Sequence, residues 1–227
     1  MAMIIESSCK CASKITDSES PCAHATVYVG TREGLGNFKG TVASLDAKTG
    51  RIIWSTPVPQ PAGATTSGSF AVGVAGSYVI AGGPTTAFAF ARSTGALVKT
   101  FTTEEFLGST AAYSEQLWVI ASTPTSILLG TNEGTIAAFD GTDLHRLWVT
   151  NTQQGSVQGL LSDGTQIFST YPNQAAVLRL TDGLLQLKIK PGSLRTDRDE
   201  QINSAPGVEP GRMFFGGLHE LYALRRP

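Results

Sequence analysis

Three cysteines and a histidine near the N-terminus form the densest group of metal-binding side chain types in the sequence. Cys9 and Cys11 are two residues apart, and Cys22 is followed two residues later by His24. Three thiolates and one imidazole can bind zinc tetrahedrally, although this spacing is not one of the strong CxxC patterns. The same residues also fit free thiols in a flexible tail, or a disulfide from Cys22 to Cys9 or Cys11. The sequence leaves these three interpretations open.

A second group of candidate ligands carries oxygen atoms of the kind that calcium binds. Its members are Asp197, Asp199, Glu200 and Asn203. Arginines are interleaved with these residues, and no glycine stands where an EF-hand loop needs one. This pattern favours a solvated, self-neutralising loop over a calcium site.

Residues for covalent or phosphate chemistry are scattered. His145 has Asp143 nearby, but no serine or cysteine stands at motif spacing, so no catalytic triad is predicted. The glycines between Gly30 and Gly40 are not followed by Gly-Lys-Ser/Thr or by a helical pattern, which excludes a phosphate-binding loop. We therefore name no catalytic residue.

An internal repeat indicates the secondary-structure elements that must position any site. The segments Gly40–Asp46 and Gly134–Asp140 match each other 94 residues apart, and each is followed by a tryptophan at the same offset, Trp54 and Trp148. Five copies can be anchored on one position, occupied by Leu45, Phe90, Phe139, Leu178 and Leu224. The intervals of 45, 49, 39 and 46 residues match the period of a four-stranded propeller blade.

The segments within each copy are short, rich in β-branched and aromatic residues, and separated by turn residues. The predicted fold is therefore all-β: a propeller of five four-stranded blades of about 45 residues. The last copy stops after its third strand, so we expect Met3–Ser7 to supply its outer strand and close the ring. An open or partial ring completed by another subunit is the alternative. The weak point is Thr16–Pro21, a polar segment where the innermost strand of the first blade is expected.

The predicted domain organisation follows from this closure. Residues 1–25 form an N-terminal segment with the closing strand and a cysteine-containing linker, and residues 26–227 form a single propeller domain.

The segment from Ala43 to Trp54, Ala-Ser-Leu-Asp-Ala-Lys-Thr-Gly-Arg-Ile-Ile-Trp, closely resembles the tryptophan-docking motif of the pyrroloquinoline-quinone (PQQ) repeat family. The resemblance covers most of the chain from about Thr26. It implies that the alanine, the acidic residue, the Thr-Gly turn and the tryptophan tie neighbouring blades together. Later copies depart from the motif: Lys99 and Leu187 stand at the tryptophan position, and Leu144 replaces the glycine.

The family includes quinone-dependent dehydrogenases as well as non-enzymatic scaffolds. The enzymes hold their cofactor with a pair of adjacent cysteines, a stacking tryptophan, an arginine and calcium-binding carboxylates. Here no two cysteines are adjacent, and all three precede the first clear strand. We expect no cofactor and assign the chain to the small non-catalytic members.

Candidate binding residues follow from the repeat alignment. Trp118 aligns with Ser69 on the innermost strand, which lines the channel of a propeller, where it could stack on a ligand or fill the bore. By the same alignment Val157 and Asn203 approach the channel. A six-residue insertion, Leu35–Gly40, adds Asn37, Phe38 and Lys39 as surface candidates, because insertions in repeat proteins concentrate on a binding face.

Composition excludes some partners. Seventeen basic and 18 acidic residues give a net charge of −1, so no electrostatic footprint for nucleic acid is present. No apolar run reaches the length of a membrane span. The segment Met1–Glu6 has no basic region, so it is not an intact signal peptide. The family resemblance favours a periplasmic or extracellular location.

The function predicted from these features is a non-enzymatic scaffold that binds a protein or a small molecule, as a monomer or a homo-oligomer. The alternatives are an enzyme with its site at the channel mouth, either a degenerate quinoprotein or a small propeller hydrolase or lyase, and one part of a larger assembled propeller.

Overall fold

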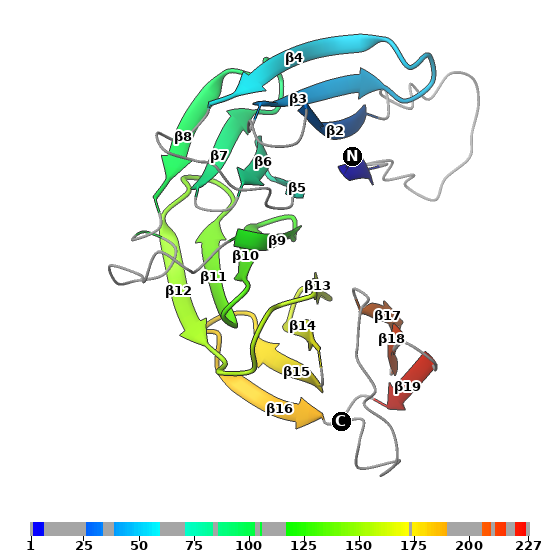
Figure 1. Ribbon diagram of the computed structural model, residues 1–227, viewed down its shortest axis with the longest axis vertical. Helices are drawn as coiled ribbons and strands as arrows, with labels where there is room; N and C mark the ends of the chain where they lie inside the picture. Colours follow the sequence, from blue (N-terminus) through cyan, green and yellow to red (C-terminus); the bar gives the residue numbers. More distant parts are fainter. Residues whose placement is uncertain are drawn as a thin grey trace, which may run out of the picture.

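The structure is a computed structural model, and it is all-β. It describes residues 2–6, 26–33, 39–59, 71–83, 86–102, 105, 117–172, 174–189, 206–209, 212–216 and 221–225. The described strands form five antiparallel sheets that follow one another in chain order around an arc (Figure 1). Within these ranges, no helix has the length and apolar character needed to cross a membrane.

Of the described strands, four lie in each of the first four sheets and three in the last. In the first sheet they are β1 (Ala2–Glu6), β2 (Thr26–Glu33), β3 (Lys39–Asp46) and β4 (Ile52–Val58). The second has β5 (Ala71–Ala75), β6 (Tyr78–Gly83), β7 (Thr86–Ala91) and β8 (Leu97–Phe101). The third has β9 (Leu117–Ser122), β10 (Ser126–Thr131), β11 (Thr135–Asp140) and β12 (Arg146–Asn151). The fourth has β13 (Gly159–Ser162), β14 (Gln166–Tyr171), β15 (Gln174–Arg179) and β16 (Leu185–Ile189). The last has β17 (Gly207–Glu209), β18 (Arg212–Gly216) and β19 (Leu221–Arg225).

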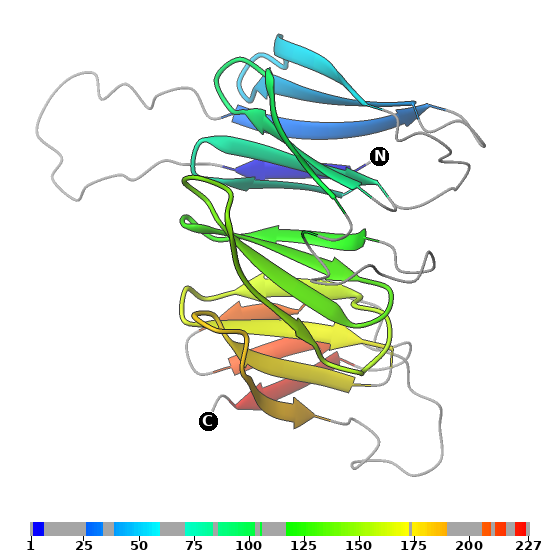
Figure 2. The ribbon, with the colours of Figure 1, turned by 90° about the vertical axis from the view of Figure 1, so that its left-hand side faces the viewer.

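The repeat deduced from the sequence matches the strand pattern. The five anchor residues all lie on the third strand of a sheet, namely β3, β7, β11, β15 and β19. Every sheet is a simple antiparallel meander, so the turns after the first and third strands lie at one end of the sheet. The second and fourth strands end at the other end, where the first strand of the next sheet begins. Figure 2 shows the successive sheets from the side, with these two ends on opposite sides of the view.

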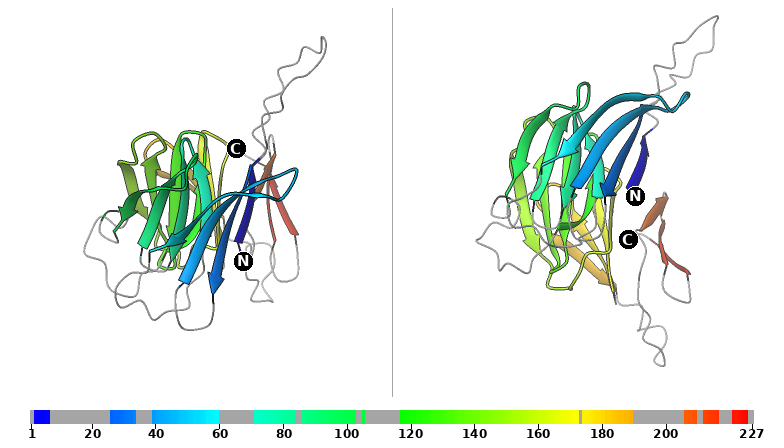
Figure 3. Two further views of the ribbon diagram at one scale, coloured as in Figure 1. Left: turned by 90° about the horizontal axis from the view of Figure 1, so that it is seen from above. Right: turned by 45° about the horizontal axis from the view of Figure 1, so that its top comes forward.

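The N-terminal strand does not pair with the last sheet, and the prediction of Met3–Ser7 as its outer strand is wrong. β1 pairs antiparallel with β2, with Ala2 opposite Gly30 and Glu6 opposite Thr26, and is the innermost strand of the first sheet. A continuous apolar run such as Met3–Ile5 is the sequence pattern of an inner strand. The polar segment Thr16–Pro21 lies outside the described residues. Figure 3 shows β1 and β19 in two different sheets at the ends of the arc.

Among the described residues the core forms four layers, each between two neighbouring sheets. One cluster joins the first and second sheets, a second joins the second and third, a third joins the third and fourth, and a smaller one joins the fourth and last. Alternate residues of a strand enter different layers, as Phe88 and Phe90 face the first sheet while Ala87 and Ala89 face the third. The middle strands are therefore buried on both faces, as the all-buried β10 illustrates.

The turn between the third and fourth strands ends in a residue with a left-handed backbone. Gly50, Gly95 and Gly183 have φ values of 70°, 72° and 69° there. In each case the glycine N–H donates a hydrogen bond to the carbonyl of the last residue of the third strand. The third sheet makes the same turn with Leu144, whose φ is 64°.

At two junctions a tryptophan on the outer strand packs on this turn in the next sheet. Trp54 Nε1 donates to the carbonyl of Arg92 at 2.9 Å, and Trp148 Nε1 donates to the carbonyl of Leu180 at 2.8 Å. A Cβ atom added to Gly95 would lie 2.5 Å from the ring of Trp54, so a side chain at this position is excluded. Both tryptophans are buried, with 9% of their surface exposed. Two residues further on, a threonine hydroxyl donates to the glycine carbonyl at each junction.

The junction between the second and third sheets replaces all three residues of this arrangement. Lys99 stands at the tryptophan position, because it pairs with Ala89 as Trp54 pairs with Ser44. Phe101 stands at the threonine position and Leu144 at the glycine position. The Lys99 ammonium donates to the Leu144 carbonyl at 2.9 Å, while Leu144 and Phe101 are buried in the same cluster.

Replacing Trp54 or Trp148 with alanine should lower the free energy of unfolding by about 3–5 kcal/mol, because each leaves a cavity beside a glycine that cannot fill it. Urea unfolding followed by far-UV circular dichroism measures this loss. The matched control is Leu147→Ala, next to Trp148 but 43% exposed, which should change stability by about 0.5 kcal/mol or less. A tryptophan variant as stable as this control would contradict the packing argument.

The second junction should convert to the tryptophan arrangement only when its three residues change together. Lys99→Trp alone should destabilise the protein because the Leu144 side chain lies at the turn that the ring must cover. Combining it with Phe101→Thr and Leu144→Gly should recover stability relative to the sum of the three single changes. If the changes in unfolding free energy of the three single variants add up to the change in the triple variant, the coupling is contradicted.

Candidate functional site

Trp118 lies at an irregular point of an innermost strand. It is the second residue of β9, which is the innermost strand of the third sheet, as the repeat alignment predicts. The pairing of β9 with β10 shifts register here: Leu117 is opposite Thr131 and Val119 is opposite Gly130. Trp118 is thus the extra residue of a β-bulge, a distortion that re-aims side chains and is frequent beside functional sites.

Val157, expected near the channel, has a different environment. Its side chain is fully buried in the cluster between the third and fourth sheets, just before β13. It packs so closely on Gly130 that a Cβ there would lie 2.9 Å from it. Val157 therefore belongs to the core.

Most of the other predicted site residues fall outside the described ranges. These are Ser69, Asn203, Asn37 and Phe38, the zinc candidates Cys9, Cys11, Cys22 and His24, and the calcium candidates Asp197, Asp199 and Glu200. Lys39 is the first residue of β3, opposite Glu33. Lys39 and Trp118 both lie at the end of the strands that carries the turn after the second strand.

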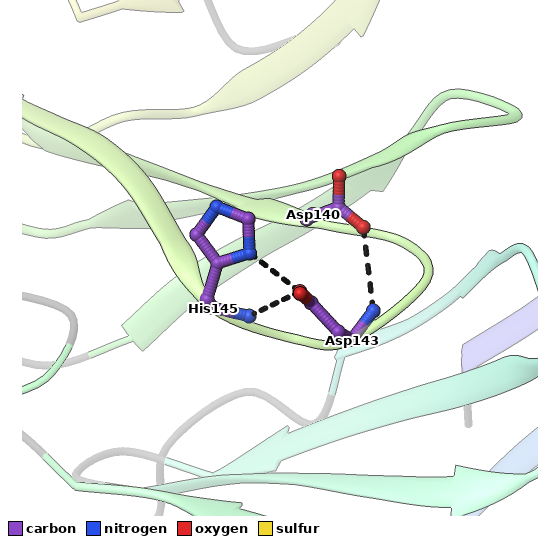
Figure 4. Close-up of side chains that lie close together, drawn as sticks. All are labelled: Asp140, Asp143 and His145. Carbon is purple, nitrogen blue, oxygen red and sulfur yellow. Dashed lines mark hydrogen bonds and ion pairs between the residues drawn. The ribbon is translucent and has the colours of Figure 1, made fainter.

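A cluster of three potential metal ligands lies at the opposite end, in the turn between β11 and β12 (Figure 4). Ligand atoms of Asp140, Asp143 and His145 all lie within 4.8 Å of one another. Asp143 Oδ1 accepts hydrogen bonds from the backbone N–H of His145 at 3.0 Å and lies 2.5 Å from His145 Nδ1. The side chains of His145 and Asp143 are 58% and 65% exposed.

Hydrogen bonds lower the pKa of both carboxyl groups. The backbone N–H of Thr142 is the main cause for Asp140, and the backbone N–H of His145 is the main cause for Asp143. The first sheet uses the same arrangement, since Asp46 Oδ1 accepts from the backbone N–H groups of Lys48 and Thr49. Asp140 is therefore explained as a turn-forming residue. Sequence analysis noted that Asp143 lies near His145, but it did not add Asp140 to this pair. The repeat alignment of Asp140 with the turn residue Asp46 is the signal that identifies it.

The set that would hold a quinone and calcium is not found on the described innermost strands. Among the residues of β1, β5, β9, β13 and β17 there is one tryptophan, Trp118, and no cysteine or arginine. The carboxylates in these strands are those of Glu6 and Glu209, each the last residue of its strand. The described donor set does not fit the cofactor.

Comparison with known proteins agrees with the repeat. A PQQ-repeat family model, described as outer membrane protein assembly factor BamB, matches residues 38–214. The chain belongs to this BamB-like family. No curated protein matches it significantly.

Three solved structures that resemble this chain are one natural protein and two designed ones. BamB from Moraxella catarrhalis superposes with a TM-score of 0.59 at 16% identity; the match covers 87% of this chain and 63% of BamB. The designed proteins Ika8 and Ika4 superpose with TM-scores of 0.63 and 0.55, both at 14% identity. The Ika8 match covers 88% of this chain and 55% of Ika8, whereas the Ika4 match covers 74% and 99%. The chain thus spans less than two thirds of BamB and Ika8. These likenesses support a propeller-like fold.

The His145→Ala variant should raise the pKa of Asp143 part of the way to its ordinary value. The imidazole contribution is lost, whereas the backbone N–H of residue 145, the larger cause, remains. A lowered carboxyl pKa stabilises the fold at pH values above the unfolded pKa, and this contribution is lost as the pH falls through the folded pKa.

Carboxyl carbon NMR titration measures the change. Asp182, whose pKa is lowered by the side chain of Arg179 in the corresponding turn of the fourth sheet, is the internal control and should not respond. An unchanged Asp143 titration curve in the variant would show that the imidazole contact does not form.

Proposed function

We propose that this chain is a non-enzymatic propeller that presents a binding surface at the end of the strands carrying Trp118 and Lys39. The observation that carries the proposal is the β-bulge at Trp118. A large aromatic residue interrupts the regular pairing of an innermost strand, close to the point where this strand begins. Loops held at one end of a rigid scaffold commonly carry binding residues.

Family membership supports a protein as the partner. The family model is named for an outer membrane protein assembly factor. By analogy, this propeller binds another protein of the cell envelope, in a periplasmic or extracellular location. In this proposal each sheet is one blade, and Trp54 and Trp148 act as docking residues that keep neighbouring blades in fixed positions.

Site-specific photo-crosslinking tests the binding surface. A benzoylphenylalanine residue in place of Trp118, in the full chain in its native host, should give a discrete crosslinked adduct that mass spectrometry identifies. The same residue in place of exposed Thr142, at the opposite end of the same sheet, is the control and should give none. The second test is Trp118→Ser, which removes the aromatic side chain and keeps a small polar one, and should weaken capture of the identified partner. Adducts from Thr142 alone would overturn the proposal.

A separate measurement discriminates the scaffold from a quinone enzyme. Pyrroloquinoline quinone with calcium should produce neither dye-linked alcohol oxidation nor a saturable rise in melting temperature. Binding to the folded state would stabilise it by about 2.7 kcal/mol at a hundredfold excess over the dissociation constant, which is easily detected. A saturable shift that disappears in Trp118→Ala would restore the enzyme class.

A further inference from the structure

A hollow of about 420 Å³ lies between the first and second sheets, at the end of the strands opposite Trp118. Its lining residues come from β2, β3, β4 and two turns of the second sheet: Thr26, Tyr28, Ser44, Ile53, Trp54, Gly76, Ser77, Arg92 and Ser93. Among the lining residues that the structure describes, Arg92 is the one that carries a formal charge. The volume is within the range of about 300–1,000 Å³ that small-molecule pockets occupy.

Arg92 is held in position by contacts of its backbone and of its guanidinium, whose Nη1 donates to the carbonyl of Gly76 at 3.5 Å. Its backbone N–H donates to the carbonyl of Ser77 at 2.8 Å, and its own carbonyl accepts the indole N–H of Trp54 at 2.9 Å. Its guanidinium Nε donates to the hydroxyl of Tyr28 at 2.9 Å, and the guanidinium carbon lies 5.6 Å from the centre of the Tyr28 ring. The cation is thus preorganised, which reduces the entropy lost when it binds an anion.

The equivalent junction between the third and fourth sheets shows that this polar lining is not required for packing. Strand register places Leu128, Ala138 and Leu180 at the positions of Tyr28, Ser44 and Arg92. There the leucines and the alanine join one apolar cluster with Trp148. The indole hydrogen bond and the threonine hydrogen bond are the same at both junctions. The first junction therefore keeps the packing contacts and replaces three apolar residues with a phenol, a hydroxyl and a guanidinium.

We propose that this hollow binds a monocarboxylate with a small aromatic or branched apolar group. The carboxylate interacts with Arg92, since guanidinium groups match carboxylates in geometry and charge. The apolar group packs on Ile53, which is 48% exposed, and on the Trp54 ring at the wall. Hydroxyl groups of Ser44, Ser77 and Ser93 supply further hydrogen-bond donors. A free organic acid and the C-terminus of a peptide share this chemistry.

Titration of the full chain with phenylacetate tests the proposal. The indole N–H signal of Trp54 should shift saturably in NMR spectra, with a dissociation constant below about 1 mM. The signal of Trp148, which makes the same hydrogen bond at the apolar junction, is the internal control. Phenylacetamide, the neutral isostere, and acetate, which lacks the ring, should each bind at least tenfold more weakly. Acetyl-Gly-Phe with a free or an amidated carboxyl group distinguishes a peptide C-terminus from a free acid.

Two arginine variants show whether the ligand binds in this hollow. Arg92→Leu installs the residue that the chain uses at the same position in the fourth sheet, so it should fold and should lose binding by tenfold or more. Arg212→Leu removes an equally charged, exposed arginine in the last sheet and should bind as the wild type does. Equal binding of phenylacetate and phenylacetamide to the wild type, or no saturable shift of Trp54, would overturn the inference without touching the surface proposed at Trp118.

Discussion

The left-handed residue that ends each turn between the third and fourth strands is the constraint on which the arrangement of the sheets depends. A positive φ lets the chain reverse within a few residues, and it turns the residue's carbonyl toward the preceding sheet. That carbonyl accepts a hydrogen bond from Thr56 or Thr150, and the indole of Trp54 or Trp148 bonds to a second carbonyl three residues earlier. Because the ring lies on the turn, Gly95 and Gly183 cannot carry a side chain. One residue type thus meets a backbone requirement and a packing requirement together.

The second junction shows that these two requirements can be separated. With lysine in place of tryptophan, the turn residue no longer has to be bare, and Leu144 occupies the left-handed position. For a non-glycine residue that conformation costs about 1–2 kcal/mol, but burying a leucine side chain gains about as much or more. Phe101, two residues after Lys99 on the same face of the strand, restores the lost aromatic surface. The centre of its ring lies 4.8 Å from the centre of the Phe139 ring. Lys99 takes over the hydrogen bond to the turn carbonyl. The three exchanges compensate one another.

The sequence revealed the parts of the fold that depend on periodicity within one copy. Leu45, Phe90, Phe139, Leu178 and Leu224 identified the third strands because they are large apolar residues at one position of the repeat. The same method treated Lys99 and Leu144 as two separate losses from the motif. They are neighbours, but in different copies, so only a comparison across junctions shows that they change together. Met3–Ile5 was misassigned for a related reason. A short apolar run fits either an outer or an innermost strand, and the pairing with β2 decides between them.

The pair Tyr28 and Arg92 escaped sequence reasoning because the two residues are 64 positions apart and belong to different copies. The constraint at the turn also permits these polar residues to stand in place of apolar ones. The contacts that fix the first sheet on the second use a glycine, a threonine and the indole N–H, and none of these needs an apolar side chain at position 28, 44 or 92. A junction held mainly by backbone carbonyls can therefore replace its remaining apolar residues with polar ones and keep its geometry. In a repeat fold, such a junction is where binding chemistry arises at least cost to stability.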